Sequence, residues 1–146
     1  MPITLRPATA DDSALLLDLR NAPDVRAVSM DSNPIDTATH QAWFDAALAN
    51  PSRTILIIQK DGADLGMVRF DRNETAVEVS IALAQMARGR GIGRAALKMA
   101  LETCPVKNLP FVARIKPENA ASLALFQQSG FSATSDPFVY ICPRTP

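Results

Sequence analysis

The sequence predicts a single α/β domain over residues 1–146, in which helices cover a mostly antiparallel sheet. Three consecutive stretches at 53–60, 64–71 and 76–84 have the composition of strands and are separated by turn residues. A stretch at 91–103 carries apolar residues at helical spacing, which gives a core-facing stripe. The length suits one domain with one core, and no repeat, low-complexity tract or linker divides it.

The N-terminal third is expected to contain one strand and two helices. A strand at 2–7 precedes a helix over 11–20, and acidic residues at the start of that helix can cap it. The stretch 21–34 has two prolines and no clear apolar period, so it is expected to be a long loop of the kind that often binds ligands. A second capped helix follows over 37–49.

In the rest of the chain, the three strands form an antiparallel meander whose turns suit hairpins. The third strand alternates, with branched apolar residues on one face and Glu78, Ser80 and Ala82 on a small, polar face. A glycine-rich turn leads into the helix at 91–103. A strand at 109–115, a helix at 118–129 and a last strand near 136–142 complete the order.

Charge and apolar patterning exclude several classes of protein. Lys plus Arg and Asp plus Glu both number 15, so no net charge attracts the chain to nucleic acid or to an anionic membrane. The apolar runs, such as the one at 55–58, are far short of the ~20 residues that span a bilayer. The chain opens without a secretory signal, so a cytoplasmic protein is expected. Cys104 and Cys142 form neither a disulfide framework nor a metal or redox motif, so we expect reduced cysteines and no metal.

The strongest chemical signal is the glycine-rich turn before the helix at 91–103. Glycines at 89, 91 and 93 let the backbone approach an anion, and the unpaired N–H groups of a helix start favour one. The arginines at 88, 90 and 94 add positive charge that suits a diphosphate. The alternative is a helix start with solvated arginines. A dinucleotide fingerprint needs a glycine where Arg94 stands, and a Walker A loop needs Gly-Lys-Ser/Thr, so neither fits.

Residues 88–93, Arg-Gly-Arg-Gly-Ile-Gly, resemble the Gln/Arg-x-x-Gly-x-Gly/Ala signature of the GNAT acetyltransferase superfamily at every specified position. Asn119, Ser122 and the run 126–131, Phe-Gln-Gln-Ser-Gly-Phe, are similar to the family's next helix and strand, and the order of elements also matches. The resemblance implies a mixed sheet of about six or seven strands flanked by about four helices. It also implies an N-acetyltransferase that uses acetyl-coenzyme A by direct transfer in a ternary complex.

Within that superfamily the chain is similar to the UDP-amino-sugar N-acetyltransferases of the pseudaminic-acid pathway, in the segments 19–26, 34–44 and 66–71. This likeness implies that the acceptor is the amine of an amino-sugar nucleotide, and the enzyme is expected to be a monomer or homodimer. Two alternatives stay open. The acceptor is a protein N-terminus, a polyamine or another small amine, or the chain is a non-catalytic acyl-coenzyme A binding module.

The resemblance also implies how the cosubstrate binds. The strand at 76–84 would splay from its neighbour, and the pantetheine arm would insert there like another strand. The N–H of Ile81 would stabilise the developing oxyanion, the amides of the glycine-rich turn would hold the diphosphate, and Asn119 would reach the pantetheine. The implied cosubstrate residues are Ile81, Ala82, Leu83, Arg88, Gly89, Arg90, Gly91, Ile92, Gly93, Arg94, Asn119, Ser122 and Phe126.

Glu78 is the candidate general base, because attack by an amine requires removal of a proton. It lies three residues before Ile81 on a face with room for a substrate, and partial burial there would raise its pKa. The alternative is an ion pair with Arg69 or Arg72 on the adjacent strand. Many family members have a tyrosine at position 126 that protonates the leaving thiolate. Phe126 cannot do so, which leaves a water, Tyr140 or an unassisted thiolate.

The candidate acceptor-binding residues are Arg20, Asn21, His40, Trp43 and Arg69. His40, the only histidine, would be a second base or a substrate ligand, or else a structural helix residue. Trp43 would offer an apolar platform, or else fill the core. Arg20 and Asn21 would contact an anionic group, or else cap the first helix.

Overall fold

The computed structural model describes residues 3–29 and 31–143, and its elements follow the predicted order closely. The helices are α1 (Ser13–Asn21), α2 (Pro23–Val28), α3 (Thr37–Ala49), α4 (Ile92–Thr103) and α5 (Ala120–Gln128), with 3-10 turns at Ala10–Asp12 and Gln85–Ala87. The strands are β1 (Thr4–Pro7), β2 (Arg53–Lys60), β3 (Ala63–Arg72), β4 (Val77–Leu83), β5 (Phe111–Arg114), β6 (Ser132–Ala133) and β7 (Val139–Cys142).

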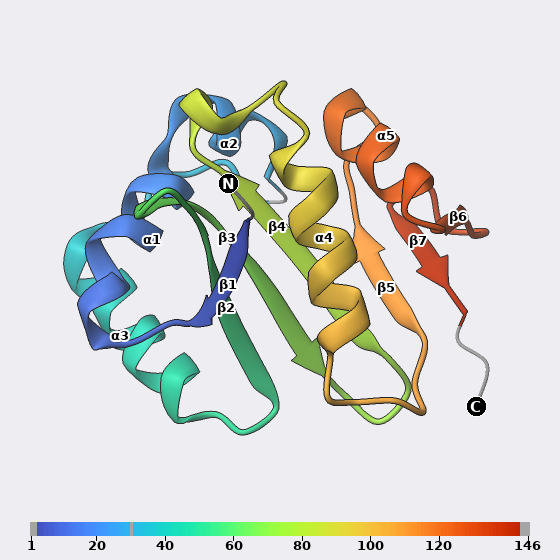
Figure 1. Cartoon of the computed structure of the whole chain (residues 1–146), viewed down its shortest axis with the longest axis horizontal. Helices are drawn as coiled ribbons and strands as arrows, with labels where there is room; N and C mark the ends of the chain where they lie inside the picture. Colours follow the sequence, from blue (N-terminus) through green and yellow to red (C-terminus); the bar gives the residue numbers. More distant parts are fainter. Residues whose placement is uncertain (1–2, 30, 144–146) are drawn as a thin grey trace.

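All seven strands belong to one sheet, in the order β1-β2-β3-β4-β5-β7-β6. Every neighbouring pair is antiparallel except β4 and β5, which run parallel because α4 crosses between them. Figure 1 shows α4 lying across the sheet, with α5 beside it and α1 and α3 at the other side of the molecule. The predicted mixed, mostly antiparallel sheet is therefore confirmed.

Two apolar clusters pack on opposite faces of the sheet, and strand alternation separates them. On β2, Ile55 and Ile57 pack against α1 and α3, whereas Ile58 packs on the face covered by α4. On β4, Val77 and Val79 are buried on the α4 face, as the predicted alternation requires. The opposite face of β4 carries Glu78, Ser80 and Ala82.

The stretch predicted to be a long loop contains a helix, α2, which is a correction to the sequence reading. Pro23 begins this helix and Asp24 lies in its first turn, both of which favour a helix start even without an apolar period. Two residues that follow α2 in the chain, Asp31 and Ile35, are tethered to α1. The side-chain amide of Asn21 donates to the Ile35 carbonyl at 2.7 Å, and its oxygen accepts from the Ile35 N–H at 2.9 Å. Arg20 donates to the Asp31 carbonyl at 3.0 Å.

The start of α1 is fixed by a buried carboxylate. Asp12, only 5% exposed, accepts from both terminal nitrogens of Arg6 at 2.8 and 2.7 Å and from the backbone N–H of Thr9 at 2.8 Å. The bond from Arg6 holds the pKa of Asp12 below its usual value, against the opposing effect of burial. Asp12 thus joins β1 to α1. It also forms a reciprocal capping box with Thr9 at the 3-10 turn Ala10–Asp12, so one of the two expected acidic residues takes part in capping, although α1 itself has no side-chain cap.

Replacing Asp12 by Ala leaves a guanidinium and a backbone N–H without their acceptor, so we expect a loss of about 2–4 kcal/mol in the free energy of unfolding. Urea denaturation at pH 7 measures it. Asp11→Ala, at an exposed neighbouring position, is the matched control and should change stability by less than about 1 kcal/mol. Equal losses in the two variants would contradict this account.

Candidate functional site

The sheet opens between β4 and β5. β4 pairs with β3 along its whole length, from Val77 to Leu83, but with β5 at only two positions, Val77 and Glu78. Beyond Glu78 the β5 side of β4 has no strand partner in the described parts of the chain. The remaining five residues of β4 therefore present an open edge.

The direction of the backbone groups on this edge follows from two hydrogen bonds at its ends. The N–H of Val77 donates to Pro110 before β5 at 2.9 Å, and the N–H of Ala84 donates to Leu65 on β3 at 2.8 Å. Because alternate residues of a strand point their backbone groups to alternate sides, Ile81 and Leu83 face the opening. Ala82, also predicted to bind the cosubstrate, directs its backbone toward β3.

The glycine-rich turn lies at the C-terminal end of this open edge (Figure 1). Gly89 and Gly91 have φ values of 71° and 75°, which side chains rarely tolerate, and nothing crowds either position. Gly93 has no positive φ, but a Cβ there would lie 3.0 Å from the Leu83 side chain, which would have to shift to make room for it. Gly91 is the N-cap residue of α4, and no described side chain caps this end, so the first N–H groups of the helix are available to an anion.

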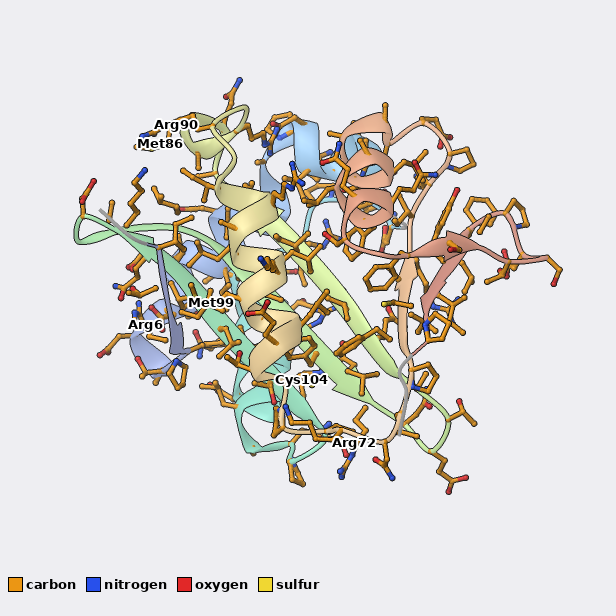
Figure 2. All side chains as sticks on the ribbon, turned by 45° about the vertical axis from the view of Figure 1, so that its right-hand side comes forward. Arg6, Arg72, Met86, Arg90, Met99 and Cys104 are labelled. Carbon is orange, nitrogen blue, oxygen red and sulfur yellow. The ribbon has the colours of Figure 1, made fainter. Side chains whose placement is uncertain are left out.

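The three arginines of the turn differ in their contacts and exposure. Arg88 forms an ion pair with Asp24 of α2 and also donates to the Leu83 carbonyl at 3.0 Å. Arg90 donates to the Met86 carbonyl at 3.5 Å, and Figure 2 shows both residues at the outer end of the turn. Arg94 is exposed on the first turn of α4. The turn therefore combines free backbone donors with cationic side chains.

On α5, the predicted cosubstrate residues have structural partners. The side chain of Asn119 caps the helix by accepting from the N–H of Ser122 at 3.2 Å. Phe126 is 3% exposed and packs edge-on against Phe131, with ring centroids 5.0 Å apart. Tyr140 lies opposite Ala113 and packs on the α4 side of the sheet, away from the polar face of β4.

Four residues of β3 and β4, Arg69, Asp71, Glu78 and Ser80, form a polar strip on the face opposite α4. Asp71 lies across from Glu78 and Arg69 across from Ser80, and Arg69 and Asp71 form an ion pair at 2.9 Å. Glu78, whose side chain is 29% exposed, pairs with neither of the arginines considered from the sequence. It accepts from Nε of Arg114 on β5 at 3.1 Å, beside the opening of the sheet.

Trp43 borders the polar strip from α3. The guanidinium carbons of Arg53 and Arg69 each lie 5.6 Å from the centroid of its ring, a distance that permits cation–π attraction. Nε of Arg69 is buried and lacks a well-aligned hydrogen bond, although it lies close to Asp71. Arg69 is held by packing on Trp43, by its ion pair with Asp71 and by a 3.5 Å hydrogen bond from Nη2 to Oγ of Ser80, and its remaining N–H groups keep donor capacity. Arg20 and Asn21, in contrast, are already bound to the backbone of Asp31 and Ile35.

His40 is buried at 3% exposure between α1 and α3, and it stacks on Phe44 with ring centroids 5.9 Å apart. Burial lowers its pKa below the usual value near 6.5, while a backbone hydrogen bond with Ser13 acts in the opposite direction. The structure therefore favours the structural alternative for this residue.

A separate cavity of about 320 Å³ lies at the other end of α4, and none of the predicted site residues lines it. Figure 2 shows two of its residues, Cys104 and Arg72, far from Arg90 and Met86. No cluster of three possible metal ligands occurs in the described part of the chain, and none of its helices is long and apolar enough to cross a membrane.

Three charged residues beside the opening or the polar strip were not predicted from the sequence. Asp24 lies in the stretch predicted to be a loop, and Arg53 and Arg114 come close to the predicted site residues only through strand pairing. The Arg114–Glu78 contact joins residues 36 positions apart on parallel strands, a register that the local pattern does not encode.

Comparison with known proteins gives concordant matches. Residues 3–132 match the family described as the acetyltransferase (GNAT) domain. An L-methionine sulfoximine/L-methionine sulfone acetyltransferase from Pseudomonas paraeruginosa is 29% identical, over 90% of this chain and 81% of that protein. A phosphinothricin acetyltransferase from Sinorhizobium meliloti, solved with acetyl-coenzyme A, superposes with a TM-score of 0.77 at 26% identity, over 92% of this chain and 77% of that one. A domain from Methanocaldococcus jannaschii has the same fold, with a TM-score of 0.81 at 23% identity over 96% and 97% of the two chains.

The buried imidazole of His40 should make stability depend on pH. Because its folded-state pKa is lowered, its contribution is complete above the unfolded pKa near 6.5 and is lost as the pH falls toward the folded pKa. Urea unfolding at pH 7.5 and pH 5.5 should show a smaller pH-dependent loss for His40→Met than for the wild type. Identical pH dependence in the two proteins would contradict this assignment.

Proposed function

Because the chain belongs to the GNAT acetyltransferase family, we propose that it transfers the acetyl group of acetyl-coenzyme A to the amine of a small amino acid or close analogue. The family match confirms the predicted acetyltransferase class and acetyl-coenzyme A as the cosubstrate. The observation that carries the proposal for this chain is the open edge of β4 beside the uncapped start of α4.

The cosubstrate fits these two features in different ways. The edge offers the Ile81 N–H and the Leu83 carbonyl, groups that pair with the amides and carbonyls of an extended pantetheine. The start of α4 offers backbone donors and the positive end of the helix dipole to a diphosphate. Arg88, Arg90 and Arg94 add charge around the same anion.

The polar strip is the proposed acceptor site. An amino acid has an amine and a carboxylate a few ångströms apart, and the strip offers an acceptor for the first, Glu78, and a donor for the second, Arg69. Trp43 would contact the side chain of the acceptor. The methionine sulfoximine and phosphinothricin enzymes are named for amino acid analogues, which favours this class over the amino-sugar nucleotide predicted from the sequence.

The reaction follows from these placements. Acetyl-coenzyme A supplies an activated acetyl group as a thioester. Glu78 takes a proton from the acceptor amine, directly or through a water, as the C–N bond forms and the C–S bond breaks. The Ile81 N–H donates to the carbonyl oxygen where negative charge develops. Phe126 has no proton to give and Tyr140 lies on the other face, so the thiolate leaves either unassisted or with a proton from water.

Glu78→Gln should lower kcat by about 100-fold or more, because the amide cannot accept the proton. Acetyl-coenzyme A affinity, measured by calorimetry, should stay within about twofold. Glu74→Gln, an exposed carboxylate in the turn before β4, is the matched control and should keep full activity. Unchanged turnover of Glu78→Gln across neutral pH would remove Glu78 from the mechanism.

Free thiol release from acetyl-coenzyme A tests the acceptor class. We expect release with L-methionine sulfoximine, phosphinothricin or related amino acids, and little with UDP-amino sugars, polyamines or short peptides, because the strip places one cationic donor, Arg69, at short range from the carboxylates Asp71 and Glu78. Preferential release with a UDP-amino sugar would restore the acceptor predicted from the sequence. Cosubstrate binding without release on any amine would favour the non-catalytic alternative.

Arg69→Met should raise the KM for the amino acid roughly tenfold or more, since it removes the charged donor for the acceptor carboxylate. Arg72→Met is the control, because Arg72 lies on the same strand but lines the cavity on the opposite, α4 face of the sheet. A similar rise in both variants, or a fall in kcat alone for Arg69→Met, would contradict carboxylate binding by Arg69.

A further inference from the structure

The guanidinium of Arg88 joins α2 to the open edge of β4. Its Nη1 donates to Oδ2 of Asp24, and its Nη2 donates to the carbonyl oxygen of Leu83 at 3.0 Å. The side chains of Arg88 and Asp24 are each 39% exposed. One side chain from the glycine-rich turn therefore covers a backbone acceptor that faces the opening of the sheet.

This arrangement competes with the cosubstrate at two places. The Leu83 carbonyl is the acceptor that an extended pantetheine needs on this edge, and it is already bonded to Arg88. Arg88 also belongs to the turn that would hold the diphosphate, but two of its donors are directed to Asp24 and Leu83 instead. The Leu83 carbonyl has a second lone pair and Arg88 has further donors, so the cosubstrate competes with these two contacts without requiring both to break first.

We propose that Asp24 is a positioning residue that sets the affinity for acetyl-coenzyme A through Arg88. In the free enzyme Asp24 holds Arg88 over the Leu83 carbonyl. When the cosubstrate binds, Arg88 exchanges the Asp24 carboxylate for the diphosphate and uncovers the edge of β4. This inference rests on the proposed function, because it takes that edge as the cosubstrate site.

The exchange is energetically modest, which makes it usable in each catalytic cycle. An ion pair at this level of exposure changes an equilibrium by roughly two- to fivefold. Removing the carboxylate should therefore strengthen cosubstrate binding, whereas damage to the fold would weaken it. A gain of affinity is the readout that a merely structural role for Asp24 does not produce.

Calorimetric titration of coenzyme A into the purified enzyme at low ionic strength tests the inference. We expect Asp24→Asn to bind roughly two- to fivefold more tightly than the wild type, and Asp24→Glu, which keeps the charge, to bind like the wild type. Asp18→Asn removes an equal charge from an exposed site on α1 and should change nothing. In an Arg88→Ala background, where the target of Asp24 is absent, Asp24→Asn should have no further effect.

Several outcomes would overturn it. Equal or weaker binding by Asp24→Asn shows that the carboxylate does not compete for Arg88. The same gain in Asp18→Asn, or in the Arg88→Ala background, shows a general charge effect. A wild type that does not bind coenzyme A refutes the proposed function itself, so that failure is distinct from a failure of the Asp24 inference. If Asp24→Asn melts at lower temperature, Asp24→Ser provides the same comparison without the carboxylate.

Discussion

The separation of β4 from β5 after Glu78 is the constraint on which the rest of the site depends. A strand in the middle of a sheet normally bonds to neighbours on both sides, yet most of β4 bonds only to β3. Its remaining N–H and C=O groups can be satisfied by water or by an extended ligand. The crossover through α4, which makes β4 and β5 parallel, supplies the second part of the site, because it brings the start of a helix to the same end of the sheet as the open edge.

The two faces of the sheet differ in chemical character. The α4 face is an apolar core that fixes the glycine-rich turn through residues such as Ile92 and Leu97, both almost fully buried. The opposite face carries the polar strip and Trp43. The open edge runs between the two faces, and the proposed function places the acetyl group of the cosubstrate there, beside the polar strip.

The charged contacts around the opening differ in strength from those that hold the fold. Asp12 is buried and bonded by Arg6 and the backbone, and such a contact is costly to break. The Arg88–Asp24 and Arg114–Glu78 pairs are partly exposed, where water and salt screen them. The buried charged contact thus lies at the start of α1, whereas the partly exposed ones lie beside the open edge of β4.

The sequence by itself determined the order of elements, the glycine-rich turn and the polar face of β4, because each depends on local spacing, capping and backbone conformation. It did not determine α2, which lacks an apolar period, or the two-residue strand β6. The partners of Glu78 and Arg88 were decided only by the tertiary structure, since Arg114 and Asp24 reach them across distant elements. Such contacts depend on strand register and helix placement, which one local stretch of sequence cannot encode.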